Sequence, residues 1–176
     1  METHGAFRIH RDARGHHAGI EALPRPEPAA GEVLVRLSYS SVNYKDALAG
    51  TGRGKILRSF PLVGGIDGAG VVEESRDARY REGDAVLATG WGLSFDHDGG
   101  YAGYLCCPAD WLGPIPPGLD PRSAMILGTA GLTAALAVHR MQVNGQRTEL
   151  GPILVTGASG GVGSLAIAIL TRLGYE

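Results

Sequence analysis

Cysteine is scarce in this sequence, and its two cysteines, Cys106 and Cys107, are neighbours. A disulfide framework or a zinc ribbon needs several spaced cysteines, so the sequence excludes both. Adjacent residues of a strand point to opposite faces of the sheet. We therefore expect buried or half-buried strand thiols here rather than a redox pair.

The sequence also lacks a strong charge of either sign and a long apolar run. Its net charge is −2 at pH 7, and the longest apolar stretch, residues 162–170, is interrupted by Gly163 and Ser164. The sequence has no excess of basic residues that would attract nucleic acid or an anionic membrane. No apolar stretch is long enough to cross a bilayer. The opening residues, METHGAFR, lack the apolar core of a secretory signal. We expect a cytoplasmic protein with no nucleic-acid or membrane partner.

Glycine, by contrast, is abundant, with 28 residues, which suggests tight turns and close backbone approaches. Short strands are predicted at residues 32–37, 70–73, 84–88 and 100–107, with a short helix at 43–49. In the first of these strands Val33, Val35 and Leu37 share one face. Several short strands at this spacing predict a β-barrel or sandwich in about the first 115 residues.

After residue 117 the pattern changes to helix. Asp120 and Pro121 are typical of an N-cap and a first helical position, and Gly128 is expected to end this helix. A second helix is predicted at 131–141, a buried strand at 153–156, and a last helix at 162–173 with Gly174 as its cap. The order is a β-rich domain, two helices, and then one β–α unit.

The turn between that strand and that helix, residues 156–163 (TGASGGVG), is the strongest chemical signal. A glycine-rich turn between a buried strand and a helix places backbone N–H groups where a pyrophosphate can bind. Gly160 would let a dinucleotide come close, and Gly163 would let the helix pack tightly on the strand. A tight turn that binds nothing is the structural alternative. No lysine follows the loop, which excludes a mononucleotide P-loop.

The same residues satisfy the T-G-x-x-x-G-x-G signature of short-chain dehydrogenases. In those proteins the motif opens the chain and a Tyr-x-x-x-Lys pair follows, whereas here 155 residues precede it and no such pair follows. A short-chain dehydrogenase is therefore the weaker alternative, and a β-barrel ahead of the loop would rule it out. The residue that separates NAD from NADP is expected about 20 residues beyond the glycines, past Glu176. Local chemistry thus leaves the cofactor choice open.

Several ordered motifs make the whole chain resemble the medium-chain dehydrogenase/reductase superfamily, and within it the zinc-independent acryloyl-CoA reductase branch, often labelled quinone oxidoreductases. The motifs are residues 40–48 (SSVNYKDAL), 65–70 (GIDGAG), 89–92 (TGWG), 110–112 (DWL), 124–131 (AMILGTAG) and the 156–164 loop.

The resemblance implies an α/β chain with a β-rich GroES-like barrel domain followed by the first β–α unit of a Rossmann domain. The expected divisions are a GroES-like catalytic domain at 1–120, connecting helices at 121–150, and the start of the Rossmann domain at 151–176. NADPH is expected in the cleft between the domains, and the complete protein is expected to be a homodimer. The chain is expected to stop inside the Rossmann domain, without the adenosine-ribose site.

By the same resemblance, the metal of zinc-dependent members is missing. Those members carry a Cys ligand where this chain has Asn43, and a His where it has Ile66. Ile66 cannot ligate a metal, and an amide is a poor zinc ligand beside thiolate or imidazole. We therefore expect no zinc.

Asn43 and Asp67 match the pair that this branch presents beside the nicotinamide, and they are the expected catalytic residues. The amide can donate to a substrate carbonyl or its developing enolate oxygen, and the carboxylate can orient a partner or relay a proton. The resemblance assigns cofactor contacts to Tyr44, Ser159, Gly160, Gly161, Val162 and Gly163.

Without a metal as Lewis acid, oxidising an alcohol is hard, and delivering hydride to an activated small molecule is easier. The expected substrate is a C=C bond conjugated to a thioester or ketone, or a quinone. Structural roles stay open for the pair, with Asn43 as a helix cap and Asp67 as an acceptor of loop amides. A non-catalytic GroES-like module that binds a partner also stays open.

Overall fold

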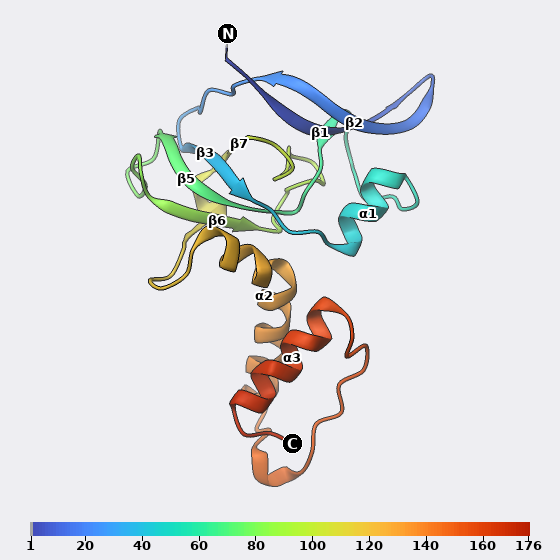
Figure 1. The fold of residues 1–176 in the computed structure, drawn as a ribbon, viewed down its shortest axis with the longest axis vertical. Helices are drawn as coiled ribbons and strands as arrows, with labels where there is room; N and C mark the ends of the chain where they lie inside the picture. The colour runs from blue at the N-terminus through green and yellow to red at the C-terminus, as the bar shows by residue number, and fades with distance from the viewer. Residues whose placement is uncertain (1) are drawn as a thin grey trace. The chain divides into compact units, whose positions relative to one another are not determined.

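The computed structural model describes residues 2–176, which form two compact units (Figure 1). The first unit ends at Ile126 and is built mainly of strands, whereas the second, Leu127–Glu176, is helical. The boundary falls inside the segment 121–150 that the sequence assigns to connecting helices.

Three strands of the first unit form an antiparallel sheet in the order β2-β1-β4. They are β1 (Thr3–Asp12), β2 (Gly15–Pro24) and β4 (Leu62–Val63). The sequence pattern predicts no strand before residue 32, so this hairpin is an addition to the predicted fold. Of the hydrophobic residues in β1, only Ala6 and Ile9 are buried, and these lie three residues apart. Without apolar alternation, periodicity could not reveal the strand.

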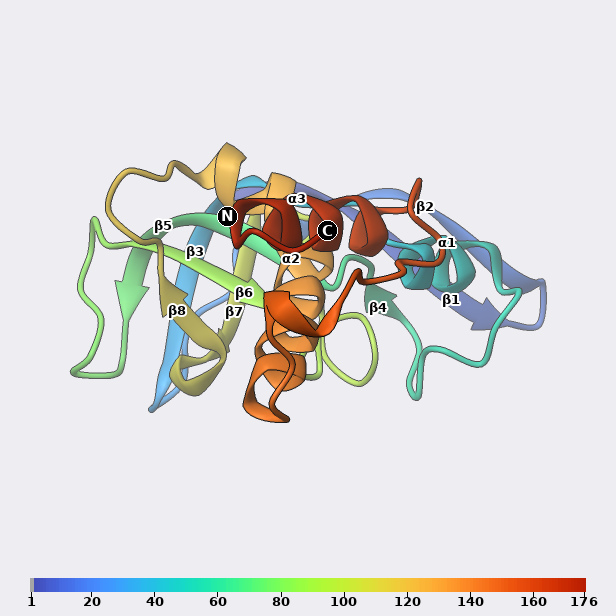
Figure 2. The same ribbon diagram turned by 90° about the horizontal axis from the view of Figure 1, so that it is seen from below.

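Five further strands, all labelled in Figure 2, form a second antiparallel sheet, and their order is β7-β3-β5-β6-β8. They are β3 (Glu32–Tyr39), β5 (Asp67–Ser75), β6 (Ala85–Thr89), β7 (Tyr104–Pro108) and β8 (Leu112–Pro114), with the 3₁₀ turn η1 (Ala109–Trp111) before β8. The predicted strands at 32–37, 70–73 and 84–88 are confirmed. The predicted helix at 43–49 is α1 (Tyr44–Thr51).

The two cysteines behave as neighbouring strand residues should. Cys107 is fully buried in the core of this sheet with Val33, Val35 and Leu105. Cys106 points the other way and is half-buried, with its Sγ 3.5 Å from Glu32 Oε2. Burial raises the pKa of both thiols to about 12, so neither is a ready thiolate at neutral pH.

The predicted strand at 100–107 starts too early, because β7 begins only at Tyr104. The preceding residues bond to a different segment, with Gly99 N–H donating to Val63 O at 3.0 Å and Gly100 N–H to Gly65 O at 2.8 Å. A Cβ atom on Gly100 would lie 1.9 Å from Asp67 O. The two backbones therefore meet too closely for any side chain between them.

Gly100→Ala should consequently destabilise the protein by about 2 kcal/mol or more, the scale of overpacking against groups that cannot move aside. The urea midpoint of unfolding of the 176-residue chain measures this loss. Gly113→Ala in β8 is the matched control, because a Cβ atom there meets nothing within 4 Å. Equal midpoints for the two variants would contradict the close approach at Asp67.

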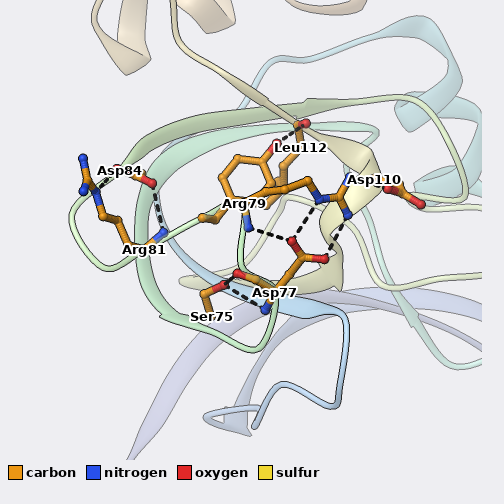
Figure 3. A network of polar contacts seen from close by, with 8 residues as sticks. Ser75, Asp77, Arg79, Arg81, Asp84, Asp110 and Leu112 are labelled. Atoms are coloured by element: carbon orange, nitrogen blue, oxygen red, sulfur yellow. Dashed lines mark hydrogen bonds and ion pairs between the residues drawn. The ribbon is translucent and has the colours of Figure 1, made fainter.

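The turn between β5 and β6 carries a network of exposed polar contacts (Figure 3). The Arg79 guanidinium bonds Asp77 Oδ1 at 2.9 Å and Asp110 Oδ1 at 2.6 Å, and its hydrogen bonds lower the pKa of Asp77 to about 2. Tyr80 OH donates to Leu112 O at 2.6 Å. Exposed ion pairs contribute little net stability, so this network chiefly fixes the shape of the turn.

Helix α2 (Pro121–Val143) is interrupted at Gly128, whose φ of 47° and ψ of −152° are not helical. The predicted break between two helices is confirmed, and Asp120 caps the first of them by accepting the Ser123 N–H at 2.6 Å. By length and composition alone α2 could cross a membrane. The break leaves segments 121–127 and 129–143, each shorter than the roughly 20 residues of a membrane-spanning helix.

The predicted strand at 153–156 is wrong, because residues 151–155 have no regular structure and residue 156 lies in a turn. A strand exists only where a neighbour shares its hydrogen bonds, and within residues 2–176 no strand lies beside this segment. Ile153 N–H instead bonds Glu176 O at 2.7 Å, and Leu154 is 89% exposed. A 3₁₀ turn, η2 (Thr148–Leu150), precedes the segment.

The predicted last helix is confirmed as α3 (Gly161–Arg172). Gly174, with a φ of 82°, ends it in a Schellman motif in which Tyr175 N–H donates to Leu170 O at 3.0 Å. Val138, Leu170 and Tyr175 form the small buried core of the second unit.

Candidate active site

Asn43 and Asp67, which lie 24 positions apart in the sequence, are in direct contact in the first unit. Asn43 immediately precedes α1, and its Nδ2 donates to Asp67 Oδ2 at 2.9 Å. The same nitrogen donates to Ser41 Oγ at 3.0 Å, and Ser41 Oγ in turn donates to Asp67 Oδ2. The three side chains thus form a closed hydrogen-bonded set, which we call the Ser41–Asn43–Asp67 triangle.

Burial differs sharply within the triangle. Asp67 is completely buried at the start of β5, whereas Asn43 and Ser41 are half-buried. A buried carboxylate needs donors, and here it has an amide and a hydroxyl. Because a carboxylate only accepts, it also fixes the Asn43 amide with its nitrogen, not its oxygen, toward Asp67.

The helix-capping role that the sequence left open for Asn43 is present as well. Asn43 is the N-cap residue of α1 and forms a capping box with Asp46, whose Oδ2 accepts the Asn43 N–H at 2.9 Å. Capping and contact with Asp67 therefore coexist in one residue. Asp67 also has its main chain tied, since Ser40 Oγ donates to Asp67 O at 2.7 Å.

Ile66, at the expected position of a zinc-ligating histidine, is buried, and its N–H donates to Asp46 Oδ1 at 3.0 Å. Across residues 2–176 no three His, Cys, Asp or Glu side chains gather as a metal site would require. The absence of zinc stays a prediction that rests on the chemistry of Asn43 and Ile66.

Two large exposed side chains belong to segments that adjoin those of the triangle. Tyr44, the first residue of α1, is 80% exposed. Trp91 is 64% exposed and adopts a φ of 52°, an uncommon value for a bulky residue. Its neighbour Gly90 donates its N–H to Ile66 O at 2.8 Å, which holds this loop beside the strand that carries Asp67.

The remaining predicted site residues, Ser159 to Gly163, lie in the second unit at the start of α3. The first residues of a helix have no intrahelical partner for their N–H groups, so Gly161, Val162 and Gly163 offer donors to a ligand. Gly157, with a φ of 63°, turns the chain into this loop. A Cβ atom on Gly163 would lie 2.3 Å from Gly157 O, so the close packing predicted for Gly163 is against the loop itself.

Ser41, Asp46 and Tyr101 join the candidate site without having been singled out from the sequence. Ser41 and Asp46 lie inside the 40–48 motif, but their roles depend on the position of Asp67, which the sequence does not give. Tyr101 OH donates to Ser41 O at 3.0 Å, across 60 positions of sequence.

Comparison with known proteins identifies the family. The alcohol dehydrogenase GroES-like domain family matches residues 29–117. YhfP of Bacillus subtilis, named as a quinone oxidoreductase, is 51% identical over 171 residues, which cover 97% of this chain and 52% of that protein. The acrylyl-CoA reductase AcuI of Ruegeria pomeroyi is 51% identical over 159 residues, covering 90% of this chain and 48% of that protein.

Solved structures agree with this result. The yhdH oxidoreductase of Salmonella enterica, crystallised in complex with NADP, matches with a TM-score of 0.93 and 47% identity over 98% of this chain and 53% of that one. B. subtilis YhfP, crystallised with NAD, matches with a TM-score of 0.93 and 42% identity over 100% of this chain and 54% of that one. The chain spans about half the length of these relatives.

The chain therefore belongs to the GroES-like alcohol dehydrogenase family, within the medium-chain dehydrogenase/reductase superfamily that its motifs predict. Two β-sheets precede the glycine-rich loop, so the short-chain alternative is wrong.

Proposed function

We propose that the protein to which this chain belongs is an NADPH-dependent reductase that delivers hydride to an activated C=C bond, conjugated to a thioester or ketone, or to a quinone. The observation that carries the proposal is the 51% identity to an acrylyl-CoA reductase over 90% of the chain. The contact between Asn43 and Asp67 supports it, because by the family resemblance Asn43 matches one zinc-ligand position of zinc-dependent members and Asp67 directly follows the other, Ile66.

The residues at the start of α3 fit a dinucleotide. The loop offers the N–H groups of a helix N-terminus, and residues 160 and 161 have no side chain to obstruct an approaching pyrophosphate. Ser159, Gly160, Gly161, Val162 and Gly163 would hold that group, and Tyr44 would contact the cofactor. NADPH, when bound, supplies the hydride. The solved relative with NADP supports this choice of cofactor, while the relative with NAD leaves room for either.

The triangle would act on the carbonyl oxygen of the acceptor. Hydride addition to a conjugated C=C bond moves negative charge onto that oxygen, and a positioned N–H donor stabilises the charge. Asn43 is the proposed donor. One of its two side-chain N–H groups would leave Ser41 Oγ and donate to the substrate oxygen instead. Asp67 would hold the amide by the other bond, in the orientation that exposes a donor.

A fusion protein that restores the missing half tests the proposal. Residues 1–176 would be fused to the half of R. pomeroyi AcuI that they do not cover, and NADPH oxidation would be followed with acryloyl-CoA, a simple enone and a quinone. We expect saturable turnover of at least one acceptor, and none with Gly163→Val, which removes the loop's close packing. A folded fusion that oxidises no NADPH with any of them would favour the non-catalytic module instead.

The 176-residue chain alone should bind NADPH too weakly to saturate in the micromolar range, because the expected adenosine-ribose contacts lie beyond it. Fluorescence titration of the chain and of the fusion compares the two. Micromolar binding by the chain alone would contradict this expectation.

A further inference from the structure

Asp46 is a buried carboxylate whose two oxygens reach two different parts of the chain. It is 6% exposed and lies in the first turn of α1. Its Oδ2 accepts the N–H of Asn43 at 2.9 Å, and its Oδ1 accepts the N–H of Ile66 at 3.0 Å. The two residues it holds are Asn43 itself and the residue directly before Asp67.

These bonds tie together the two chain segments that carry Asn43 and Asp67. Asn43 and Asp67 come from a helix start and from a strand, elements that no main-chain ladder joins. The Asp46 carboxylate links the two segments, and a single side chain can accept both N–H groups because a carboxylate has two oxygens. Its charge strengthens both bonds, since hydrogen bonds to an ionised acceptor are roughly twice as strong as neutral ones.

A third contact comes from Tyr101. Its ring lies against Gly64 and Gly65, where a Cβ atom on Gly65 would come within 2.6 Å of the ring. Tyr101 OH donates to Ser41 O at 3.0 Å. Burial, and then the neighbouring Asp46 carboxylate, raise the pKa of Tyr101, so its hydroxyl stays protonated and able to donate.

We propose that Asp46 is the positioning residue of the Ser41–Asn43–Asp67 triangle, setting the separation of Asn43 and Asp67 by clamping the backbone on both sides. The assignment rests on the proposed function for its consequence in catalysis, but not for its geometry. Asp46 touches neither substrate nor cofactor in this role. Misplacing a catalytic group by about 1 Å can cost roughly a hundred-fold in rate, so a clamp of this kind matters.

Asp46→Asn is the direct test, because an amide has the same shape but only one acceptor oxygen. Either the main-chain N–H of Asn43 or that of Ile66 must then face the NH₂ group of the new amide, and the hydrogen bond on that side is lost. In the 176-residue chain, we expect the side-chain amide resonances of Asn43 to shift in nitrogen–proton correlation spectra. In the fusion protein, we expect kcat to fall about ten- to a hundred-fold with the KM for NADPH little changed.

Asp84→Asn is the matched control. Asp84 is also a carboxylate that accepts a main-chain N–H, from Arg81 at 2.9 Å (Figure 3). It lies at the turn end of the β5–β6 hairpin, whereas Asp67 pairs with Thr89 at the opposite end. This variant should leave both the Asn43 resonances and kcat as in the parent protein.

If Asp46→Asn does not fold, Tyr101→Phe replaces it, because it removes one hydroxyl from the same network and should move the Asn43 resonances in the same direction. Unchanged Asn43 resonances in the folded Asp46→Asn chain would overturn the assignment, whatever the turnover. So would unchanged resonances in Tyr101→Phe where that variant is needed. A fusion protein without turnover would count against the proposed function alone. The spectra of the 176-residue chain test the positioning role of Asp46 without any need for turnover.

Discussion

Asn43→Ala in the fusion protein should lower kcat by roughly ten- to a thousand-fold, the range for losing one positioned donor to a developing oxyanion. The affinity for NADPH should change little, because the lost interaction is made only with charge that develops during the reaction. Steady-state kinetics with acryloyl-CoA, together with a fluorescence titration of NADPH, measures both quantities. Asp67→Ala should also lower kcat, because it leaves the Asn43 amide without the acceptor that orients it.

Asn144→Ala is the matched control for this substitution. Asn144 is the only other asparagine of the chain and lies exposed just after α2. Asn144→Ala removes a side-chain amide, as Asn43→Ala does, but from a helix end that has no part in the triangle. The kcat of this variant should therefore equal that of the parent protein. Wild-type turnover in both Asn43→Ala and Asp67→Ala would leave the pair with the structural roles alone, as helix cap and buried acceptor.

Much of the fold followed from the sequence wherever a local signal existed. Val33 and Val35 lie on one face of β3, two residues apart, as a strand requires. Asp120 and Pro121 predict the start of α2, and Gly128 and Gly174 predict where helices end. The β1–β2 hairpin gave no such signal, because only Ala6 and Ile9 of β1 and no residue of β2 are buried. Its presence depends on partners such as β4, which lies about 50 residues further along the chain.

The candidate site divided in the same way. The family motifs pointed to Asn43 and Asp67, and the structure brings the two into contact. Asp46 lay in the same motif, yet a carboxylate in the first turn of a helix predicts only that it caps that helix. Its second bond, to Ile66, depends on how α1 and β5 meet. Tyr101 was equally invisible, because its partners lie on segments that come together only in the folded chain.

The strand predicted at 153–156 failed for a reason that leads to a further expectation. An apolar segment of this kind is typical of a parallel strand covered on both faces, and its pairing partners are absent from residues 2–176. Many large apolar side chains of the second unit are correspondingly exposed: Leu127, Leu132, Leu136, Val143, Leu150, Leu154, Val162, Ile167 and Leu173. Leu170 is an exception, since it packs with Val138 and Tyr175.

In the 176-residue chain, residues 150–176 should therefore either associate with a second copy or exchange their amide hydrogens fastest. Leaving three or four such side chains uncovered forgoes about 5–10 kcal/mol, comparable with the whole net stability of a domain. The small core around Leu170 is far less extensive than the core that holds β3 and β5. Local openings of the second unit should thus be frequent on the time scale of exchange.

The measurement is hydrogen exchange on a sample shown by sedimentation to be monomeric, so that association cannot supply the missing cover. Amides from Ile153 to Leu170 should exchange nearly as in an unfolded chain, while those of β3 and β5 stay protected by the sheet. In the fusion protein the same amides should become protected, because the added half would supply neighbouring strands. Strong protection across Ile153 to Leu170 in the monomeric chain would contradict the argument, since it would mean that α2, α3 and the C-terminal turn suffice to hold this segment.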